Sequence, residues 1–160
     1  MRELLIIIAS IQIKKLIIEN KMEFPYNCEK LLGCDAEGFV IIDGKKGINA
    51  LSVGTTAPQV MKTFGKQAIM DGQNAIYDII DKIGAASSKA QGLPAIITSG
   101  SRLFTSDTRL YLRAEGNRAL ALLKVGVKKL FIRNETGTIK EITPLCVLDF
   151  YVHESMQRNG

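Results

Sequence analysis

The hydrophobic pattern is most regular between residues 65 and 83, where isoleucines and alanines recur mostly at spacings of three and four. That period is the one expected of an amphipathic helix. Gly72 weakens the middle of the predicted helix, and Gly84 is a plausible end for it. The small-residue stretch AASSKAQG that follows is predicted to be a linker.

Shorter apolar runs in the first half of the chain predict strands. Residues 40–43 and 48–51 flank Gly44-Lys45-Lys46-Gly47, which favours a β-hairpin whose turn displays two lysines. Two β-branched runs around residues 10–15 predict a further strand pair, and residues 94–98 a short apolar strand. Residues 20–38 and 99–108 lack a sustained period, so we expect a surface excursion and a loop there.

The second half begins with alternating residues 109–113, which predict a half-buried strand followed by a turn at residues 114–117. A helix is then expected from near Arg118, because leucines and valines follow at helical spacing. Gly126 equally permits that helix to end and residues 128–133 to form a strand, and the pattern leaves both open. Residues 139–143 predict a strand that Pro144 stops, and the run 147–152 fits either a buried strand or a docking edge.

The length of 160 residues predicts a single domain, and the composition of 46% hydrophobic and 23% charged residues is that of a folded protein. Lys14 and Lys15 interrupt the apolar N-terminus too early for a spanning helix, so no membrane association is expected. The net charge is +5, and its surplus cations lie near both ends. Arg113, Arg118, Lys128 and Lys129 fall at junctions between predicted elements, which suggests a polyanionic partner.

Three cysteines, Cys28, Cys34 and Cys146, are an odd number without paired CxxC spacing, which favours free thiols in a reducing compartment. Together with His153 they could make a Cys3His zinc site. The short ligand spacings that close such sites are missing, so we predict no metal.

Three stretches carry a resemblance to a known family: QNAIYDII at residues 73–80, LYLR with GNR at residues 110–118, and IKEITPL at residues 139–145. They resemble the eleventh family of universal small-subunit ribosomal proteins in its bacterial and organellar form. The resemblance implies an α/β fold with a mixed sheet flanked by helices, of the ribonuclease-H-like kind found in translational components. It further implies a structural role on the platform of the small subunit near the messenger exit, without catalysis, cofactor or small-molecule substrate.

Carried over to this sequence, the resemblance implies contacts to small-subunit ribosomal RNA from Lys62, Lys66, Arg113, Asn117, Arg118 and Lys140. The two lysines of the predicted turn, Lys45 and Lys46, are expected to bind the RNA as well. Ala114 and Glu115 depart from the family's glycine-rich turn, and the tail 145–160 lacks its basic ending. We therefore expect that tail to meet neighbouring ribosomal proteins, in a divergent mitochondrial ribosome of the matrix.

Two other classes remain as alternatives. Asp43, Asp71, Asp78 and Asp81 could form the carboxylate cluster of a metal-dependent nuclease, although the last three share the exposed face of the predicted helix. A small α/β scaffold protein that dimerises through its sheet edges is the other.

Overall fold

The computed structural model describes residues 22–48 and 57–157, and of residues 57–69 only the backbone. The predicted strand pair around residues 10–15 lies outside these ranges. The elements, in chain order, are α2 (Cys28–Leu32), β1 (Phe39–Asp43), the 3₁₀ helix η1 (Gly44–Lys46), α3 (Ala57–Ala90), α4 (Gly100–Phe104), β2 (Thr108–Glu115), β3 (Arg118–Val127), β4 (Leu130–Arg133), β5 (Ile139–Ile142) and β6 (Leu145–Val152).

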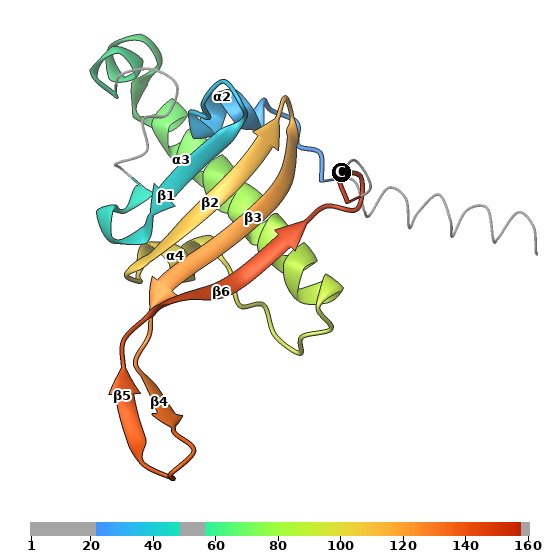
Figure 1. Cartoon of the computed structure of the whole chain (residues 1–160). Helices are drawn as coiled ribbons and strands as arrows, with labels where there is room; N and C mark the ends of the chain where they lie inside the picture. Colours follow the sequence, from blue (N-terminus) through green and yellow to red (C-terminus); the bar gives the residue numbers. More distant parts are fainter. Residues whose placement is uncertain (1–21, 49–56, 158–160) are drawn as a thin grey trace, which may run out of the picture.

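Four strands form one sheet in the order β1-β2-β3-β6, and α3 lies across one of its faces (Figure 1). The strands β4 and β5 form a separate hairpin that extends away from this sheet (Figure 1). The predicted α/β class, a sheet with helices, is confirmed. The prediction of a mixed sheet is wrong, because all pairings among the described strands are antiparallel. The predicted ribonuclease-H-like arrangement is not supported.

The core lies between α3 and the sheet. Four isoleucines of α3 are completely buried against inward-facing side chains of the strands, among them Leu110, Leu112 and Leu122; the four are Ile76, Ile79, Ile80 and Ile83. The predicted helix is therefore confirmed, but it continues to Ala90 through the expected linker. It does so because Gly84 packs against the backbone of Thr98 rather than ending the helix, and a positive φ of 65° at Gly92 follows the last turn.

The predicted helix after Arg118 is wrong, because residues 118–127 form strand β3. Gly116, with φ of 57°, and Asn117 make a two-residue turn that pairs Glu115 with Arg118. In this segment Leu120 and Leu122 are buried, whereas Leu123 faces solvent. The strand alternative at residues 128–133 is confirmed for β4, as are the strands predicted at residues 109–113 and 139–143.

Two short segments also differ from the prediction. Residues 94–98 form no strand, and α4 begins within the expected loop, where the Ser99 side chain accepts a hydrogen bond from the Arg102 amide. At the predicted hairpin around Gly44–Lys46, the turn residues form η1, and β1 pairs with β2. The second strand of that hairpin falls largely outside the described residues.

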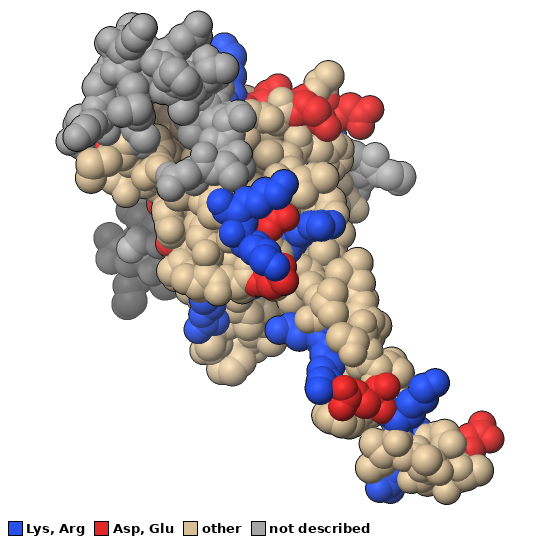
Figure 2. All heavy atoms as spheres, turned by 90° about the vertical axis from the view of Figure 1, so that its left-hand side faces the viewer, with Lys and Arg blue, Asp and Glu red and all other residues tan. Residues whose placement is uncertain are grey.

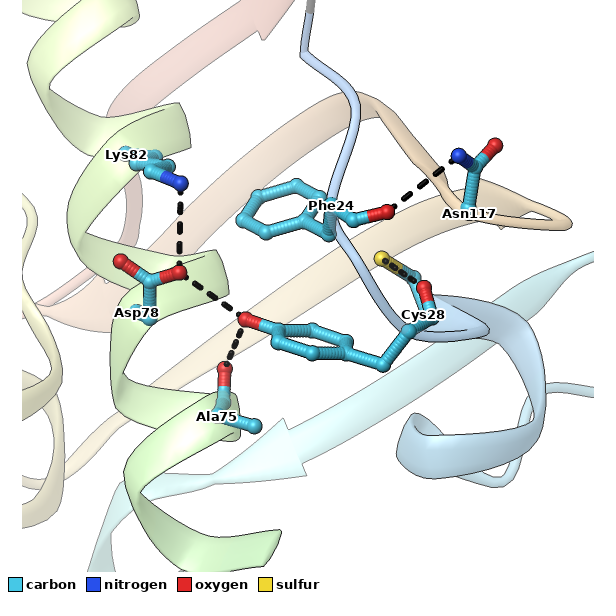
Figure 3. A network of polar contacts seen from close by, with 7 residues as sticks. Phe24, Cys28, Ala75, Asp78, Lys82 and Asn117 are labelled. Atoms are coloured by element: carbon cyan, nitrogen blue, oxygen red, sulfur yellow. Dashed lines mark hydrogen bonds and ion pairs between the residues drawn. The ribbon is translucent and has the colours of Figure 1, made fainter. Parts of the chain in front are cut away.

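Residues 22–34 were expected on the surface, yet they contribute Phe24, Cys28 and Leu32 to the core. Figure 3 shows how polar contacts fasten this segment at two places. The Tyr26 hydroxyl donates to the Asp78 carboxylate at 2.9 Å and lies 3.2 Å from the Ala75 carbonyl, both on α3. At the β2–β3 turn, the Asn117 side-chain amide donates to the Phe24 carbonyl at 3.3 Å, as Figure 3 shows, and the Phe24 amide donates to the Asn117 carbonyl at 2.9 Å.

We expect Tyr26→Phe to lower the free energy of unfolding by about 1 kcal/mol, the typical contribution of a half-exposed hydrogen bond. For a chain of this size that corresponds to a fall in Tm of about 2–4 °C, measurable by thermal denaturation. Tyr111→Phe is the matched control, since no hydrogen bond of that hydroxyl is formed within the described residues. An equal fall in both variants would contradict the assigned role.

None of the helices in residues 22–48 and 57–157 combines the length and the hydropathy needed to cross a lipid bilayer.

Candidate functional site

Strand β6 carries a bulge where it pairs with β3. Lys124 lies opposite Asp149 and Val125 lies opposite Val147, so that Leu148 is an extra residue in the ladder. Bulges occur preferentially at sheet edges and beside active sites, where they redirect a side chain. The bulge in β6 is therefore a candidate position for a functional site.

The bulge coincides with the two charged side chains that are buried in the described part of the chain. Lys124 is 8% exposed and Asp149 is 3% exposed, and they face each other across β3 and β6. Burying a charge costs free energy unless the charge is paired and hydrogen-bonded. Two buried charged side chains beside a bulge are thus a feature that sheet packing alone does not require.

Three side chains from outside the sheet donate hydrogen bonds to the Asp149 carboxylate. Ser87 Oγ lies 2.7 Å and Gln91 Nε2 3.0 Å from Oδ1; Ser87 belongs to the C-terminal end of α3, and Gln91 directly follows that helix. Thr98 Oγ1 lies 2.5 Å from Oδ2, from the segment just before α4. The carboxylate therefore ties β6 to two other parts of the fold.

Lys124 completes this group of residues. Its Nζ atom donates to the Ile97 carbonyl at 3.4 Å. Burial lowers the pKa of the Lys124 ammonium, the Asp149 carboxylate opposes that shift, and the nearby cations Arg102 and Lys128 add to it. A lysine whose pKa is perturbed by desolvation and a specific partner is a common mark of a functional site.

The outer edge of β6 is the second component of the site. Within the described residues β6 has a strand neighbour only on its β3 side. Leu145, Val147 and Phe150 are 69%, 62% and 63% exposed. Near the end of the strand, Gln91 reaches over this edge and donates to the Phe150 carbonyl at 3.3 Å. An edge of this kind can pair with an extended molecule that carries amide groups.

A cavity of about 580 Å³ lies elsewhere, between α2, the start of β1 and the end of β2. Its lining includes Glu29, Glu37, Phe39, Arg113 and Glu115, and none of the residues around Asp149. We place the site at β6 because the buried charges and the perturbed pKa lie there, whereas the cavity is open and bordered by exposed side chains.

The residues predicted to bind RNA are distributed over separate elements. Lys45 and Lys46 lie on η1, Lys62 and Lys66 on α3, Asn117 in the β2–β3 turn, and Lys140 on the distant β5. Some have acidic neighbours in the fold: Lys45 lies 3.6 Å from Asp107, and Arg118 forms an ion pair with Glu115. The guanidinium of Arg113 lies over the ring of Phe39. Arg113 lies on β2 and Arg118 on β3, so the eight residues come from different parts of the fold.

The aspartates of the nuclease alternative have structural roles. Asp43 accepts from the Lys45 amide and pairs with Arg109, Asp78 pairs with Lys82, and Asp81 accepts from the Gly100 amide at 2.7 Å. Asp71 is exposed on α3. No group of three or more His, Cys, Asp or Glu residues is arranged to hold a metal ion in the part of the chain that the structure describes.

None of the residues of this site was predicted from the sequence; they are Ser87, Gln91, Thr98, Lys124 and Asp149. Two signals for them are present in the sequence. Lys124 occupies an inward position between Leu122 and Gly126, and Asp149 interrupts the apolar run VLDFYV. Polar residues at positions where a strand faces the core point either to a structural network or to a site.

Comparison with known proteins identifies the family. The sequence model of the family described as "GNAT acetyltransferase, Mec-17" matches residues 46–160, which contain α3 to β6. The chain is 37% identical over 139 residues to an alpha-tubulin N-acetyltransferase of Tetrahymena thermophila, an alignment that covers 87% of this chain and 31% of that protein. It is 39% identical over 145 residues to alpha-tubulin N-acetyltransferase 1 of Danio rerio, covering 87% of this chain and 43% of that protein.

A shorter match has higher identity. The alpha-tubulin N-acetyltransferase of Leishmania braziliensis is 53% identical over 83 residues, which cover 51% of this chain and 35% of that protein. The chain thus spans about a third to two fifths of the length of these relatives.

These matches overturn the interpretation as a ribosomal protein. The predicted role in the small ribosomal subunit is wrong, and with it the partnership with ribosomal RNA and, through residues 145–160, with ribosomal proteins. The prediction of a chain without catalytic function is contradicted as well, because the matched family consists of acetyltransferases. The mitochondrial location rested on the ribosomal resemblance and is not supported. The chain belongs to the Mec-17 family of GNAT acetyltransferases.

Proposed function

We propose that this protein is an acetyltransferase that moves an acetyl group from acetyl-CoA to the side-chain amine of a lysine in α-tubulin. The observation that carries the proposal is the family match, which runs through residues 46–160 and includes Lys124, Asp149 and the bulged β6. The names of the relatives supply the acceptor, since all three matches described above are alpha-tubulin N-acetyltransferases.

The reaction sets clear requirements on the site. A bond forms between the lysine Nζ and the carbonyl carbon, and the bond from that carbon to sulfur breaks. The lysine ammonium gives up two protons, of which one goes to the leaving thiolate and the other to solvent. The protein must hold donor and acceptor in one orientation and supply hydrogen-bond donors where negative charge develops on the carbonyl oxygen. A strand edge beside a bulge offers fixed backbone amides for that purpose.

The outer edge of β6 fits the donor molecule. Acetyl-CoA supplies the activated acetyl group, as a thioester, on a long arm that contains two amides. Between Leu145 and Asp149 the edge has no strand neighbour among the described residues, so its backbone N–H and C=O groups would pair with such an arm in the manner of an added strand. The exposed side chains of Val147 and Phe150 would flank it.

The β4–β5 hairpin is our candidate for contact with the protein substrate. It extends from the body of the molecule, and Figure 2 shows basic and acidic side chains along it and basic ones where it joins the body. Its apolar side chains are exposed too, with Phe131 at 67%. An isolated two-stranded hairpin is at best marginally stable in water, so exposed apolar residues on both strands favour a binding role.

Acetylation of α-tubulin tests the proposed function. Tagged protein isolated from the cells that express it would be incubated with purified tubulin and isotopically labelled acetyl-CoA, and labelled acetyllysine on α-tubulin would be located by mass spectrometry. We expect labelling of α-tubulin that depends on protein and on time. Folded protein that gives no more label than heat-denatured protein would refute the proposal.

We expect Phe131→Ala to raise the KM for tubulin roughly tenfold with little change in kcat, because an aromatic anchor in an interface commonly contributes 1–2 kcal/mol. Steady-state kinetics with tubulin as the varied substrate measures this. Phe39→Ala is the matched control, since Phe39 is a partly exposed phenylalanine of β1 that lies outside the hairpin. Equal KM values for the two variants would contradict the assignment of the hairpin.

A further inference from the structure

We propose that Asp149 is a positioning residue for acetyl transfer. It holds the bulged part of β6 in a fixed position relative to the segment before α4. The inference rests on the proposed function, and it concerns a residue that does not itself touch the reacting atoms. Its carboxylate accepts hydrogen bonds from Ser87, Gln91 and Thr98, which come from two separate parts of the chain.

Asp149 lies where its hydrogen bonds can fix the geometry of the bulge in β6. Asp149 directly follows Leu148, the extra residue of the bulge, on the strand whose outer edge is the proposed binding edge. Strand pairing alone specifies a bulged region weakly, because the ladder is interrupted there. A side chain anchored from outside the sheet supplies the missing constraint.

The network also extends to the neighbouring segment. Thr98 Oγ1 reaches Asp149 while Lys124 Nζ, opposite Asp149 on β3, reaches the Ile97 carbonyl, and the Ile97 amide donates to Ser88 Oγ at 3.3 Å. Consecutive residues of the segment before α4 are therefore fixed to the sheet and to α3 at once. Displacing the carboxylate would release both the bulge and this segment.

Hydrophobic residues of similar volume would stabilise this position as well as a buried charge does, and often better. A buried carboxylate with three donors is instead suited to defining one geometry, since each hydrogen bond requires its own direction. A rate that depends on orientation is sensitive to displacements of about 1 Å. We therefore expect the loss of Asp149 to affect kcat more than substrate binding.

The test compares Asp149→Asn with the wild-type protein in two measurements. In the tubulin assay, run at a temperature well below the measured Tm of both proteins, we expect kcat to fall at least tenfold while both KM values change less than threefold. In hydrogen–deuterium exchange, we expect exchange at residues 96–99 and 145–152 to accelerate at least tenfold, while residues 22–48 stay unchanged. The second measurement needs no activity.

Matched variants separate positioning from a general loss of stability. Tyr26→Phe lowers stability far from β6 and is expected to retain the wild-type kcat. Thr98→Val has nearly the same shape as the native side chain and removes one donor. It replaces Asp149→Asn if the latter does not fold, with an expected three- to tenfold loss in kcat.

The outcomes are distinguishable. Unchanged exchange at residues 96–99 and 145–152 in the variant overturns the positioning role whether or not the wild-type protein acetylates tubulin. Accelerated exchange with an unchanged kcat overturns the link to catalysis. A wild-type protein that folds and fails to acetylate tubulin refutes the proposed function, and the exchange measurement still decides how Asp149 acts on the fold.

Discussion

Gly84→Ala is expected to lower Tm by about 6–12 °C. A methyl group at this position of α3 would lie 1.9 Å from the Thr98 carbonyl oxygen and 2.8 Å from its carbon. Both atoms belong to the backbone, so the helix and the segment before α4 would have to separate. Overpacking of this kind costs about 3 kcal/mol or more, and each kcal/mol corresponds to about 2–4 °C in a chain of this size.

The sign of the effect makes this a strict test. At an unconstrained position within a helix, replacing glycine by alanine stabilises a protein by up to about 1 kcal/mol. A Tm that stays constant or rises would show that α3 and Thr98 are not in contact. Lys89→Ala is the control within the same helix, where an exposed substitution is expected to change stability by less than about 0.5 kcal/mol. Differential scanning calorimetry measures both variants.

The second large effect is a loss of stability at alkaline pH. Burial raises the pKa of the Cys28 thiol from an ordinary 9.0 to about 12, with the nearby Cys34 adding to the shift. Burial likewise raises the pKa of the Cys34 thiol to about 11 and that of the Tyr151 hydroxyl to about 12. These groups keep their protons in the folded state at pH values where the unfolded chain has lost them.

The folded state therefore binds more protons than the unfolded state above pH 9, and the free energy of unfolding must fall as the pH rises. The stabilising contribution of Cys28 is fully present below pH 9 and is lost as the pH approaches 12. Between these values Cys28 removes up to about 1.4 kcal/mol per pH unit, Tyr151 acts in the same direction between pH 10 and 12, and the less buried Cys34 contributes a smaller share between pH 9 and 11. Urea unfolding at pH 8, 9, 10 and 11, with a reductant present, should show a decline that steepens above pH 9.

A variant identifies the group responsible. Cys28→Ala is less stable than the wild type at pH 8, because it leaves a cavity in the core. Between pH 9 and 11 the free energy of unfolding of this variant should fall less steeply than that of the wild type, because the contribution of the Cys28 thiol is missing. Cys146→Ala is the control, because the Cys146 thiol lies outside the core around α2 and is only partly buried. Parallel curves for Cys28→Ala and the wild type would contradict the assignment.

The features that local pattern determines could be predicted from the sequence. The spacing of Ile76, Ile79, Ile80 and Ile83 predicts α3 because one side of the helix is fully buried. The alternation in residues 109–113 predicts β2 because one side of that strand faces the core. Pro144 stops β5 as its missing amide requires.

The errors arise where tertiary contacts override the local pattern. Leucine-rich β3 also satisfies a helical period, and its alternation is hidden because the inward position between Leu122 and Gly126 is occupied by Lys124. Gly84 has the sequence signature of a helix end, yet its role is a close approach to Thr98. Neither Lys124 nor Gly84 can be interpreted without the segment before α4.

The misleading ribosomal resemblance has a similar cause. Its three stretches are an amphipathic helix, a strand with its turn, and a strand that ends at proline, which many α/β proteins contain. The fold places them in different surroundings, and residues 139–142 lie on the protruding hairpin rather than in the main sheet (Figure 1). The site could not be predicted because Ser87, Thr98 and Asp149 meet only through the packing of α3 on β6.

The pairing of β1 with β2 governs the order of events during synthesis. Asp43 pairs with Arg109, which follows it by 66 residues, and Phe39 pairs with Arg113. At a translation rate of about 5–20 residues per second, the first strand of the sheet remains without its neighbour for several seconds. Contacts of such long range also slow folding, because the intervening chain must lose its freedom before they form. The completion of this sheet is therefore a late step in the life of the nascent chain, one that waits for the β2–β3 hairpin to emerge.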